Sequence, residues 1–214
     1  MCDFLIKVVL VGNQNTGKST LIHNYISNHT PTIGVDFASH NIIYNNKNIK
    51  LHIWDTSGNL SFLNVIKIYL KNSVCAIIVF SLNDLESFNK IDFWYNEIVM
   101  TSNDYKKFIL IGTYIHENFV INPEMIHNKC IQYNFQYYQA NEKFLMQDCL
   151  LNAISSIFKD YREMPYKFRN LEGFKNNSPK KVTTDYINFD NNEEWSEEDE
   201  KCKYLCCKKN CYIL

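Results

Sequence analysis

The sequence predicts an α/β fold in which a mostly parallel, six-stranded sheet carries helices on both faces. Short apolar runs, as expected of strands buried on both faces, alternate along the chain with segments whose apolar residues recur at helical spacing. A glycine-containing loop at residues 12–19 separates the first apolar run from the first helical segment. Strand, short loop and helix in repeated succession are typical of a doubly wound sheet.

These patterns place the individual elements. The runs predicted as parallel strands are residues 4–11, 75–80 and 108–111. Residues 35–44 and 49–54 are predicted as an antiparallel hairpin, because the turn between them contains asparagines that tolerate left-handed backbone. The helices predicted from apolar spacing are residues 19–27, 87–100 and 142–158. Trp94, on the apolar stripe of the second helix, is interpreted as a core residue.

The composition indicates one globular domain with an appendage. With 214 residues, of which 46% are hydrophobic, the chain can bury one substantial core. We place the domain at residues 1–160 and a disordered tail at residues 161–214, because beyond Arg162 the helical spacing gives way to Asn, Pro, Ser, Lys and Asp. The net charge of −1 gives no general attraction to nucleic acid. No apolar run approaches the roughly 20 residues that span a bilayer.

Residues 12–19 read Gly-Asn-Gln-Asn-Thr-Gly-Lys-Ser and match the phosphate-binding pattern G-x-x-x-x-G-K-[ST]. In this pattern, backbone N–H groups and a helix N-terminus surround a di- or triphosphate. The lysine, Lys18, reaches the outer phosphates, and the hydroxyl of Ser19 ligates Mg²⁺. The strand before the loop and the helix after it supply the context that the pattern requires. The sequence therefore predicts a site for a nucleoside phosphate.

Two further strings end at the same edge of the predicted sheet. Thr32-Ile33-Gly34-Val35-Asp36-Phe37 leads into the second strand, and Trp54-Asp55-Thr56-Ser57-Gly58-Asn59 closes the third. Together with the phosphate loop, these strings closely resemble those of a Rab-type small GTPase of the Ras superfamily, over about residues 7–158. The resemblance implies a P-loop small G domain that binds GDP or GTP with Mg²⁺.

The resemblance also implies roles for individual residues. Lys18 would neutralise the β- and γ-phosphates, while Thr32 and the N–H of Gly58 would contact the γ-phosphate. The implied ligands of Mg²⁺ are Ser19, Thr32 and Asp55. The implied nucleotide-binding residues are Gly12, Asn15, Thr16, Gly17, Lys18, Ser19, Thr20, Thr32, Asp55, Gly58, Thr113, Tyr114, His116 and Ala140. The residues implied to meet effector proteins are Ile33, Phe37, Trp54 and Tyr69.

The base-reading motif departs from the family pattern of Asn or Thr, Lys, any residue and Asp, because here it reads Thr-Tyr-Ile-His at residues 113–116. Tyr114 is predicted to stack on the base. A neutral imidazole at His116 accepts one hydrogen bond, whereas an aspartate accepts two from guanine. Glu117 is an alternative acceptor one residue later. In the loop that backs the base, Ala140 is retained, so its N–H is predicted to reach the base oxygen.

Hydrolysis is predicted to be slow. The residue that orients the attacking water is glutamine in the family and Asn59 here, one methylene shorter. Asn59 and Lys18 are therefore the candidate catalytic residues. The stretch at residues 19–32 is shorter than is usual in the family and lacks the aromatic that covers guanine, for which Tyr25 is a partial replacement.

The last four residues, Cys-Tyr-Ile-Leu, match the C-a-a-X pattern, and a terminal leucine favours geranylgeranylation of Cys211. A single lipid chain holds a membrane reversibly, so a second signal is expected. Cys206 and Cys207 are candidate palmitoylation sites, and neighbouring lysines attract anionic lipid. Disulfides are not expected, because the protein is expected in the reducing cytosol.

These features predict a prenylated Rab-like switch that cycles between GDP and GTP on the cytoplasmic face of an intracellular membrane, with a cytosolic pool, in vesicle-mediated transport. The resemblance implies a monomer and, as partners, effector, exchange-factor, GTPase-activating, escort and dissociation-inhibitor proteins. Two alternatives stay open. One is a Rab-shaped membrane scaffold that hardly binds or hydrolyses nucleotide. The other is a nucleotide-binding protein with a changed base preference.

Overall fold

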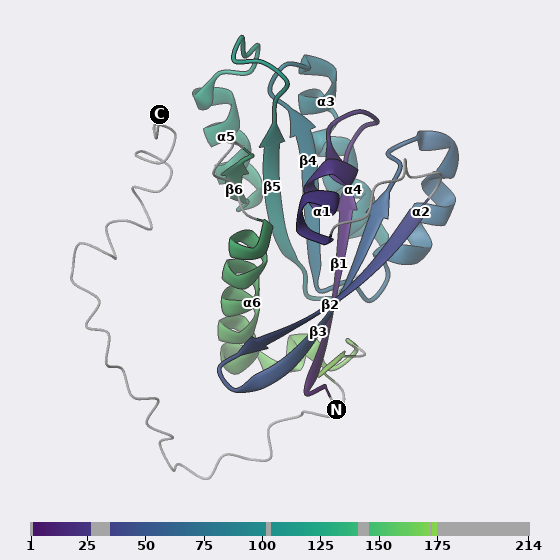
Figure 1. Ribbon diagram of the computed structural model, residues 1–214, viewed down its shortest axis with the longest axis vertical. Helices are drawn as coiled ribbons and strands as arrows, with labels where there is room; N and C mark the ends of the chain where they lie inside the picture. The colour runs from purple at the N-terminus through teal and green to yellow at the C-terminus, as the bar shows by residue number, and fades with distance from the viewer. Residues whose placement is uncertain (1, 27–34, 102–103, 141–145, 172, 175–214) are drawn as a thin grey trace, which may run out of the picture.

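The computed structural model describes residues 2–26, 35–101, 104–140, 146–171 and 173–174, and Figure 1 shows their arrangement. A six-stranded sheet lies at the centre, in the order β2-β3-β1-β4-β5-β6. Its strands are β1 (Phe4–Val11), β2 (Val35–Tyr44), β3 (Lys47–Thr56), β4 (Cys75–Ser81), β5 (Lys107–Thr113) and β6 (Gln136–Gln139). Every neighbouring pair is parallel except β2 with β3. The predicted fold class is confirmed.

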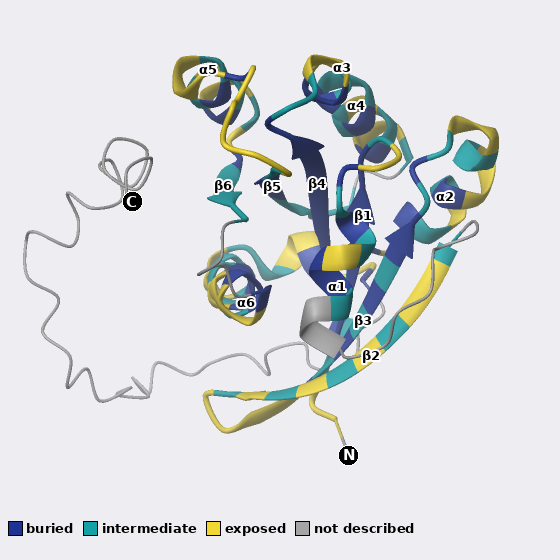
Figure 2. Ribbon diagram, turned by 45° about the horizontal axis from the view of Figure 1, so that its top comes forward, coloured by how far each residue is buried: buried dark blue, intermediate teal, exposed yellow. Residues whose placement is uncertain are grey.

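Helices cover both faces of this sheet. They are α1 (Lys18–Ile26), α2 (Leu63–Leu70), α3 (Leu85–Asn89), α4 (Ile91–Thr101), α5 (Pro123–Tyr133) and α6 (Met146–Glu163). Because side chains alternate across a strand, successive residues of β1 enter two separate cores. Val8 and Leu10 pack in the core that contains α1 and α6, and Val9 and Val11 pack in the core that contains α2, α4 and α5. Figure 2 shows the buried central strands between partly exposed helices.

Most predicted elements match the structure to within a few residues, but the hairpin and the second predicted helix differ in form. The hairpin turn is tighter than predicted, because Asn45 and Asn46 alone form it, with φ of 48° and 57°. A two-residue turn with both residues left-handed matches the twist of the paired strands, so β3 begins at Lys47 rather than at residue 49. The helix predicted at 87–100 is divided into α3 and α4 at Lys90, where ψ is −2°.

The packed domain continues beyond residue 160, where we had placed its end. Helix α6 runs to Glu163, and a short 3₁₀ turn, η2 (Pro165–Phe168), follows it. Phe168 and Phe174 are buried with ring centroids 4.9 Å apart, and Phe174 lies 5.5 Å from Phe4 at the start of β1. Most residues of this stretch are polar, so the sequence pattern did not reveal its few, widely spaced aromatic residues, which complete the core beside α6. The rest of the predicted tail lies outside the described residues.

None of the helices among the described residues combines the length and the apolar character that a membrane crossing needs.

Candidate nucleotide site

The phosphate loop joins β1 to α1 and lies against β4. Gly12 has φ of +141°, and a Cβ at this position would come within 2.0 Å of the carbonyl oxygen of Val79. A side chain is therefore excluded, and the loop backbone can pack closely on the sheet. Asn15, at the exposed tip of the loop, is also left-handed, with φ of 61°. The following helix begins at Lys18, so its first N–H groups are directed at the loop.

Lys18 lies inside this loop with only 4% of its surface exposed. Its Nζ donates to the carbonyl oxygens of Gly12, at 3.0 Å, and Asn13, at 2.5 Å, and to the hydroxyl of Thr16 at 3.4 Å. Burial lowers the pKa of Lys18 to about 8, although the charge of Asp55 acts in the opposite direction. The loop thus holds a cation that has lost most of its hydrating water. An anion bound beside Lys18 would stabilise its charge.

Two of the three predicted metal ligands are in contact. Asp55, at the end of β3, is 4% exposed, and the hydroxyl of Ser19 in the first turn of α1 donates to its Oδ2 at 2.5 Å. A carboxylate and a hydroxyl are oxygen donors of the kind that Mg²⁺ prefers, usually alongside waters and substrate phosphates. The donor set therefore fits the implied ion, which Asp55 and Ser19 would hold. Thr32, the third predicted ligand, lies outside the described residues.

The loop after β3 closes over the phosphate loop. Gly58 has φ of +71°, and a Cβ there would lie 2.2 Å from the carbonyl oxygen of Gly12, so only glycine allows this approach. The next residue, Asn59, uses its side-chain oxygen to accept the N–H of Ser61 at 2.9 Å, which caps the 3₁₀ turn η1 (Leu60–Phe62). The side chain predicted to orient water is thus engaged in a local cap.

The loop after β5 is tied to the phosphate loop. Thr113 donates its hydroxyl to the carbonyl oxygen of Thr16 at 2.7 Å and lies 3.1 Å from that of Phe80. Tyr114 is half-buried, and its ring meets that of Phe119 edge to face, with centroids 5.3 Å apart. His116 is exposed on the same loop. The residues predicted to read the base therefore lie beside those predicted to bind phosphate.

Ala140 has a different partner from the one predicted. Its N–H donates to the carbonyl oxygen of Gly112 at 2.8 Å, because the register of β5 and β6 sets Gln139 opposite Gly112. The N–H that we had assigned to the base oxygen is therefore part of the sheet in this structure. Asn141, the next residue, lies outside the described residues.

Two side chains that support the site were not predicted for that role. Asn83, after β4, accepts the N–H of Ile115 at 2.9 Å and donates to the carbonyl oxygen of Asn118 at 3.0 Å, so it shapes the base loop. Trp94, interpreted as a core residue, is fully buried and also donates its indole N–H to Asn13 Oδ1 at 3.2 Å. The contacts of both side chains join residues far apart in sequence, so no local sequence pattern predicts them.

The predicted effector residues come together on the outer face of β2, β3 and α2. The ring centroid of Trp54 lies 4.7 Å from that of Phe37 and 4.4 Å from that of Tyr69. Phe37 is 45% exposed. The ammonium of Lys7 lies 5.6 Å from the Trp54 ring and 5.9 Å from the Tyr69 ring, within range of a cation–π interaction. Ile33 lies outside the described residues.

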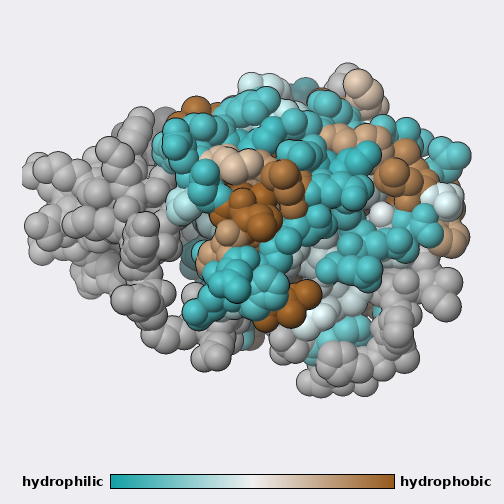
Figure 3. Space-filling model, turned by 90° about the horizontal axis from the view of Figure 1, so that it is seen from above, coloured by the Kyte–Doolittle hydropathy of each residue, from teal (hydrophilic) through white to brown (hydrophobic). Residues whose placement is uncertain are grey.

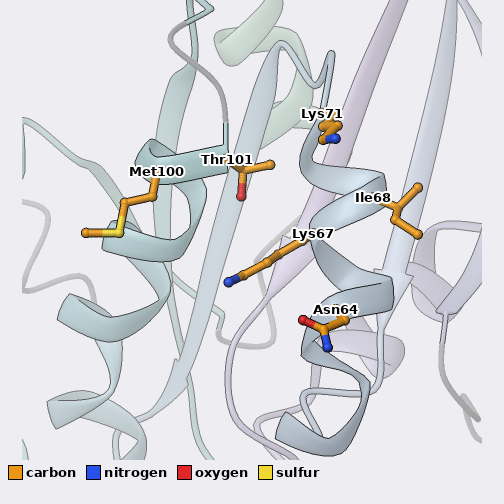
Figure 4. A pocket seen from close by; sticks show the side chains of 6 residues that line it. All are labelled: Asn64, Lys67, Ile68, Lys71, Met100 and Thr101. Carbon is orange, nitrogen blue, oxygen red and sulfur yellow. The ribbon is translucent and has the colours of Figure 1, made fainter.

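The face that carries the loops at the carboxyl ends of the strands is hydrophilic over most of its described area, with a few separate apolar groups (Figure 3). Thr20 is exposed on the first turn of α1. A cavity of about 280 Å³ lies elsewhere, between α2 and α4, and it contains none of the predicted site residues (Figure 4). Its lining residues are Asn64, Lys67, Ile68, Lys71, Met100 and Thr101.

Comparison with known proteins identifies the family to which this fold belongs. A model of the Ras family matches residues 7–159. A "Probable Rab-related GTPase" of Acanthamoeba polyphaga mimivirus is 41% identical over 98 residues, which are 43% of this chain and 46% of that protein. The "GTP-binding protein YPTM1" of Zea mays is 35% identical over 115 residues, 51% of this chain and 55% of that protein.

A third similar protein is the "Ras-related protein Rab-4" of Dictyostelium discoideum, which is 35% identical over 114 residues. These residues are 51% of this chain and 56% of that protein. The chain thus spans about half the length of the curated relatives it matches. The matched family region, residues 7–159, includes every described element from the phosphate loop to β6.

Proposed function

Because the chain belongs to the Ras family, as a Rab-type small GTPase, we propose that it is a GDP- and GTP-binding switch that acts on a membrane in vesicle-mediated transport. The observation that carries this proposal is the phosphate loop, in which buried Lys18 lies near the Ser19–Asp55 pair. A buried cation near a hydroxyl and a carboxylate suits a magnesium-bound polyphosphate, because a bound anion offsets the cost of burying the charge of Lys18.

We assign the steps of nucleotide binding to the chain as follows. The loop N–H groups and the Lys18 ammonium receive the β- and γ-phosphates, which replace the water that Lys18 has lost. Ser19 and Asp55 would hold Mg²⁺, which would supply positive charge near the phosphates. The N–H of Gly58 would contact the γ-phosphate and would lose this contact when that phosphate leaves.

The pH dependence of nucleotide affinity tests the role of Lys18. The pKa of Lys18 is lowered to about 8, and a bound phosphate raises it again, so binding takes up a proton. We expect the affinity for GDP, measured by calorimetry, to fall about tenfold between pH 7 and pH 9, as Lys18 of the ligand-free protein loses its proton. In the Lys18→Arg variant, whose side chain stays charged, the profile should be flat. An equal decline in both proteins would contradict this assignment.

Slow hydrolysis is proposed from Asn59. Its side chain is one methylene shorter than glutamine, and its oxygen caps η1. We expect Asn59→Gln to raise the single-turnover hydrolysis rate of GTP by about tenfold or more, because the longer amide reaches the attacking water. Asn59→Ala, whose side chain has no amide group, should show no increase in the hydrolysis rate. A wild-type rate typical of ordinary Rab proteins, or no gain in Asn59→Gln, would disprove the proposal.

We also propose that the tail anchors the protein, through a prenyl group on Cys211 with acylation of Cys206 and Cys207 as a second signal. This places the switch on the cytoplasmic face of an intracellular membrane. Prenyl transfer to the purified full-length chain, compared with its Cys211→Ser variant, tests the anchor. The cluster of Phe37, Trp54 and Tyr69 is the proposed effector surface, and the regulators of prenylation, exchange, hydrolysis and extraction are proposed partners by analogy with the family.

A second candidate is a Rab-shaped membrane scaffold with weak nucleotide binding, favoured by the local engagement of Asn59 and by the histidine at residue 116. The two candidate functions predict different amounts of bound nucleotide in the purified protein. Chromatography of the nucleotide released from protein purified from its native host decides between them. Stoichiometric GDP or GTP supports the switch, and an empty site supports the scaffold.

A further inference from the structure

The imidazole of His116 is held by Asn83. The amide orientation of Asn83 is fixed by its backbone contacts, since Oδ1 accepts the N–H of Ile115 at 2.9 Å and Nδ2 donates to the carbonyl oxygens of His116, at 2.9 Å, and Asn118, at 3.0 Å. Reversing the amide would place oxygen against two carbonyl oxygens and nitrogen against an N–H. The nitrogen of Asn83 is thus the atom that faces the ring.

This contact decides which ring nitrogen of His116 carries the proton. Asn83 Nδ2 lies 3.1 Å from His116 Nδ1. The amide nitrogen cannot accept, and its two hydrogens are shared between this ring nitrogen and the two carbonyl oxygens, so a proton on Nδ1 is disfavoured. A neutral imidazole carries one N–H proton, and the contact with Asn83 favours its place on Nε2. In this tautomer, the Nε2–H of His116 is a hydrogen-bond donor that a bound base could meet. The acceptor of the ring, Nδ1, faces Asn83 and is not available to a base.

His116 lies on a loop that is joined to the phosphate loop, so its N–H donor could face the base of a bound nucleotide. Thr113 joins the loop after β5 to the phosphate loop through its 2.7 Å bond to Thr16. A nucleoside whose phosphates occupy the phosphate loop would then have residues 113–116 within reach of its base. Guanine presents its N1–H and its amino group, which are both donors, on the edge that an aspartate would read. A donor at His116 cannot pair with either of them.

We propose that His116, fixed by Asn83 as the Nε2–H tautomer, removes guanine selectivity, so that the site takes purine nucleoside phosphates as a class. The proposal rests on the nucleotide binding proposed above. Affinity then comes from the phosphates, Mg²⁺ and the shared purine face, and it differs little between guanine, hypoxanthine and adenine. A site built to pair with a donor discriminates by orders of magnitude, whereas a site without that pairing does not.

Calorimetry of the full-length protein with the magnesium complexes of GDP, IDP and ADP at pH 7.5 tests the proposal. We expect the three dissociation constants to agree within about tenfold. His116→Asp, which provides an acceptor, should raise the preference for GDP over ADP by about 100-fold or more. Glu117→Gln tests the alternative acceptor on the same exposed loop, and the proposal expects it to leave the three constants in their wild-type order.

A wild-type preference for GDP over ADP of about 100-fold or more would overturn the proposal while leaving the proposed switch intact. If Glu117→Gln abolished that preference, Glu117 would be the acceptor in place of His116. If none of the three nucleotides bound, the proposed function and this inference would fail together.

Nitrogen NMR of the histidine side chains provides a readout that does not depend on nucleotide. In the ligand-free protein, we expect the neutral ring of His116 to be protonated on Nε2 and not on Nδ1. Asn83→Ala should abolish this fixed preference and populate both tautomers. Protonation on Nδ1 in the wild-type protein would overturn the proposal.

Discussion

Replacing Lys18 by methionine is expected to weaken GDP binding by about 100-fold or more, because it removes a charge-assisted contact to the phosphates. Methionine has a similar length and no charge, so the space inside the loop stays filled. Calorimetric titration with the magnesium complex of GDP measures the effect. Lys47→Met, at the exposed start of β3, is the matched control and should leave the affinity unchanged.

The same variant should remain folded in the absence of nucleotide. Lowering the pKa of Lys18 from 10.5 to about 8 corresponds to a cost of about 3 kcal/mol for keeping the charge in the loop. The substitution relieves this cost but leaves the carbonyl groups of Gly12 and Asn13 without their donor, at about 1–3 kcal/mol each. The two effects are of similar size. Unchanged GDP affinity in a folded Lys18→Met protein would refute the assigned phosphate site.

Truncating Phe168 to alanine is expected to lower the free energy of unfolding by about 3–5 kcal/mol, the usual cost of emptying a fully buried aromatic position. Such a loss is a large fraction of the about 5–15 kcal/mol that holds a typical domain folded. Denaturant unfolding followed by circular dichroism measures it. The prediction concerns a segment that the sequence placed in the tail, so it also tests the extended domain boundary.

Tyr166→Ala is the control for this experiment. Tyr166 belongs to the same 3₁₀ turn but is 59% exposed, so its truncation should change the free energy of unfolding by less than about 0.5 kcal/mol. Equal and small effects of the two substitutions would show that the segment after α6 does not pack on the domain in solution.

The sequence predicted most reliably those strands that are buried on both faces. β4 is buried at every residue, and its short apolar run is typical of a strand that is covered on both faces. β6 has only four residues, all half-buried and none purely aliphatic, so no alternation marks it. α2 was missed because exposed Val65 and Ile68 blur the contrast between its two faces. α5 was missed although Asn122 caps its start.

The candidate site likewise has one half that the sequence predicted and one half that it did not. Its phosphate half is a contiguous string, in which spacing alone implies a function for Lys18 and Ser19. Its base half depends on tertiary contacts, since Asn83 reaches residues 32 to 35 positions away to shape the loop. The bond from Trp94 to Asn13 joins residues 81 positions apart. Apolar spacing correctly placed Trp94 in the core but carried no information about its indole N–H.

The packing of Phe174 on Phe4 determines where the remaining chain leaves the domain. Phe4 is the first residue of β1, and the phosphate loop follows the last residue of that strand. Eight residues of strand span roughly 26 Å, so the exit point and the phosphate loop lie at opposite ends of β1. If the tail attaches to a membrane as proposed above, it leaves the domain far from the phosphate loop, so the start of the tail does not cover the loop.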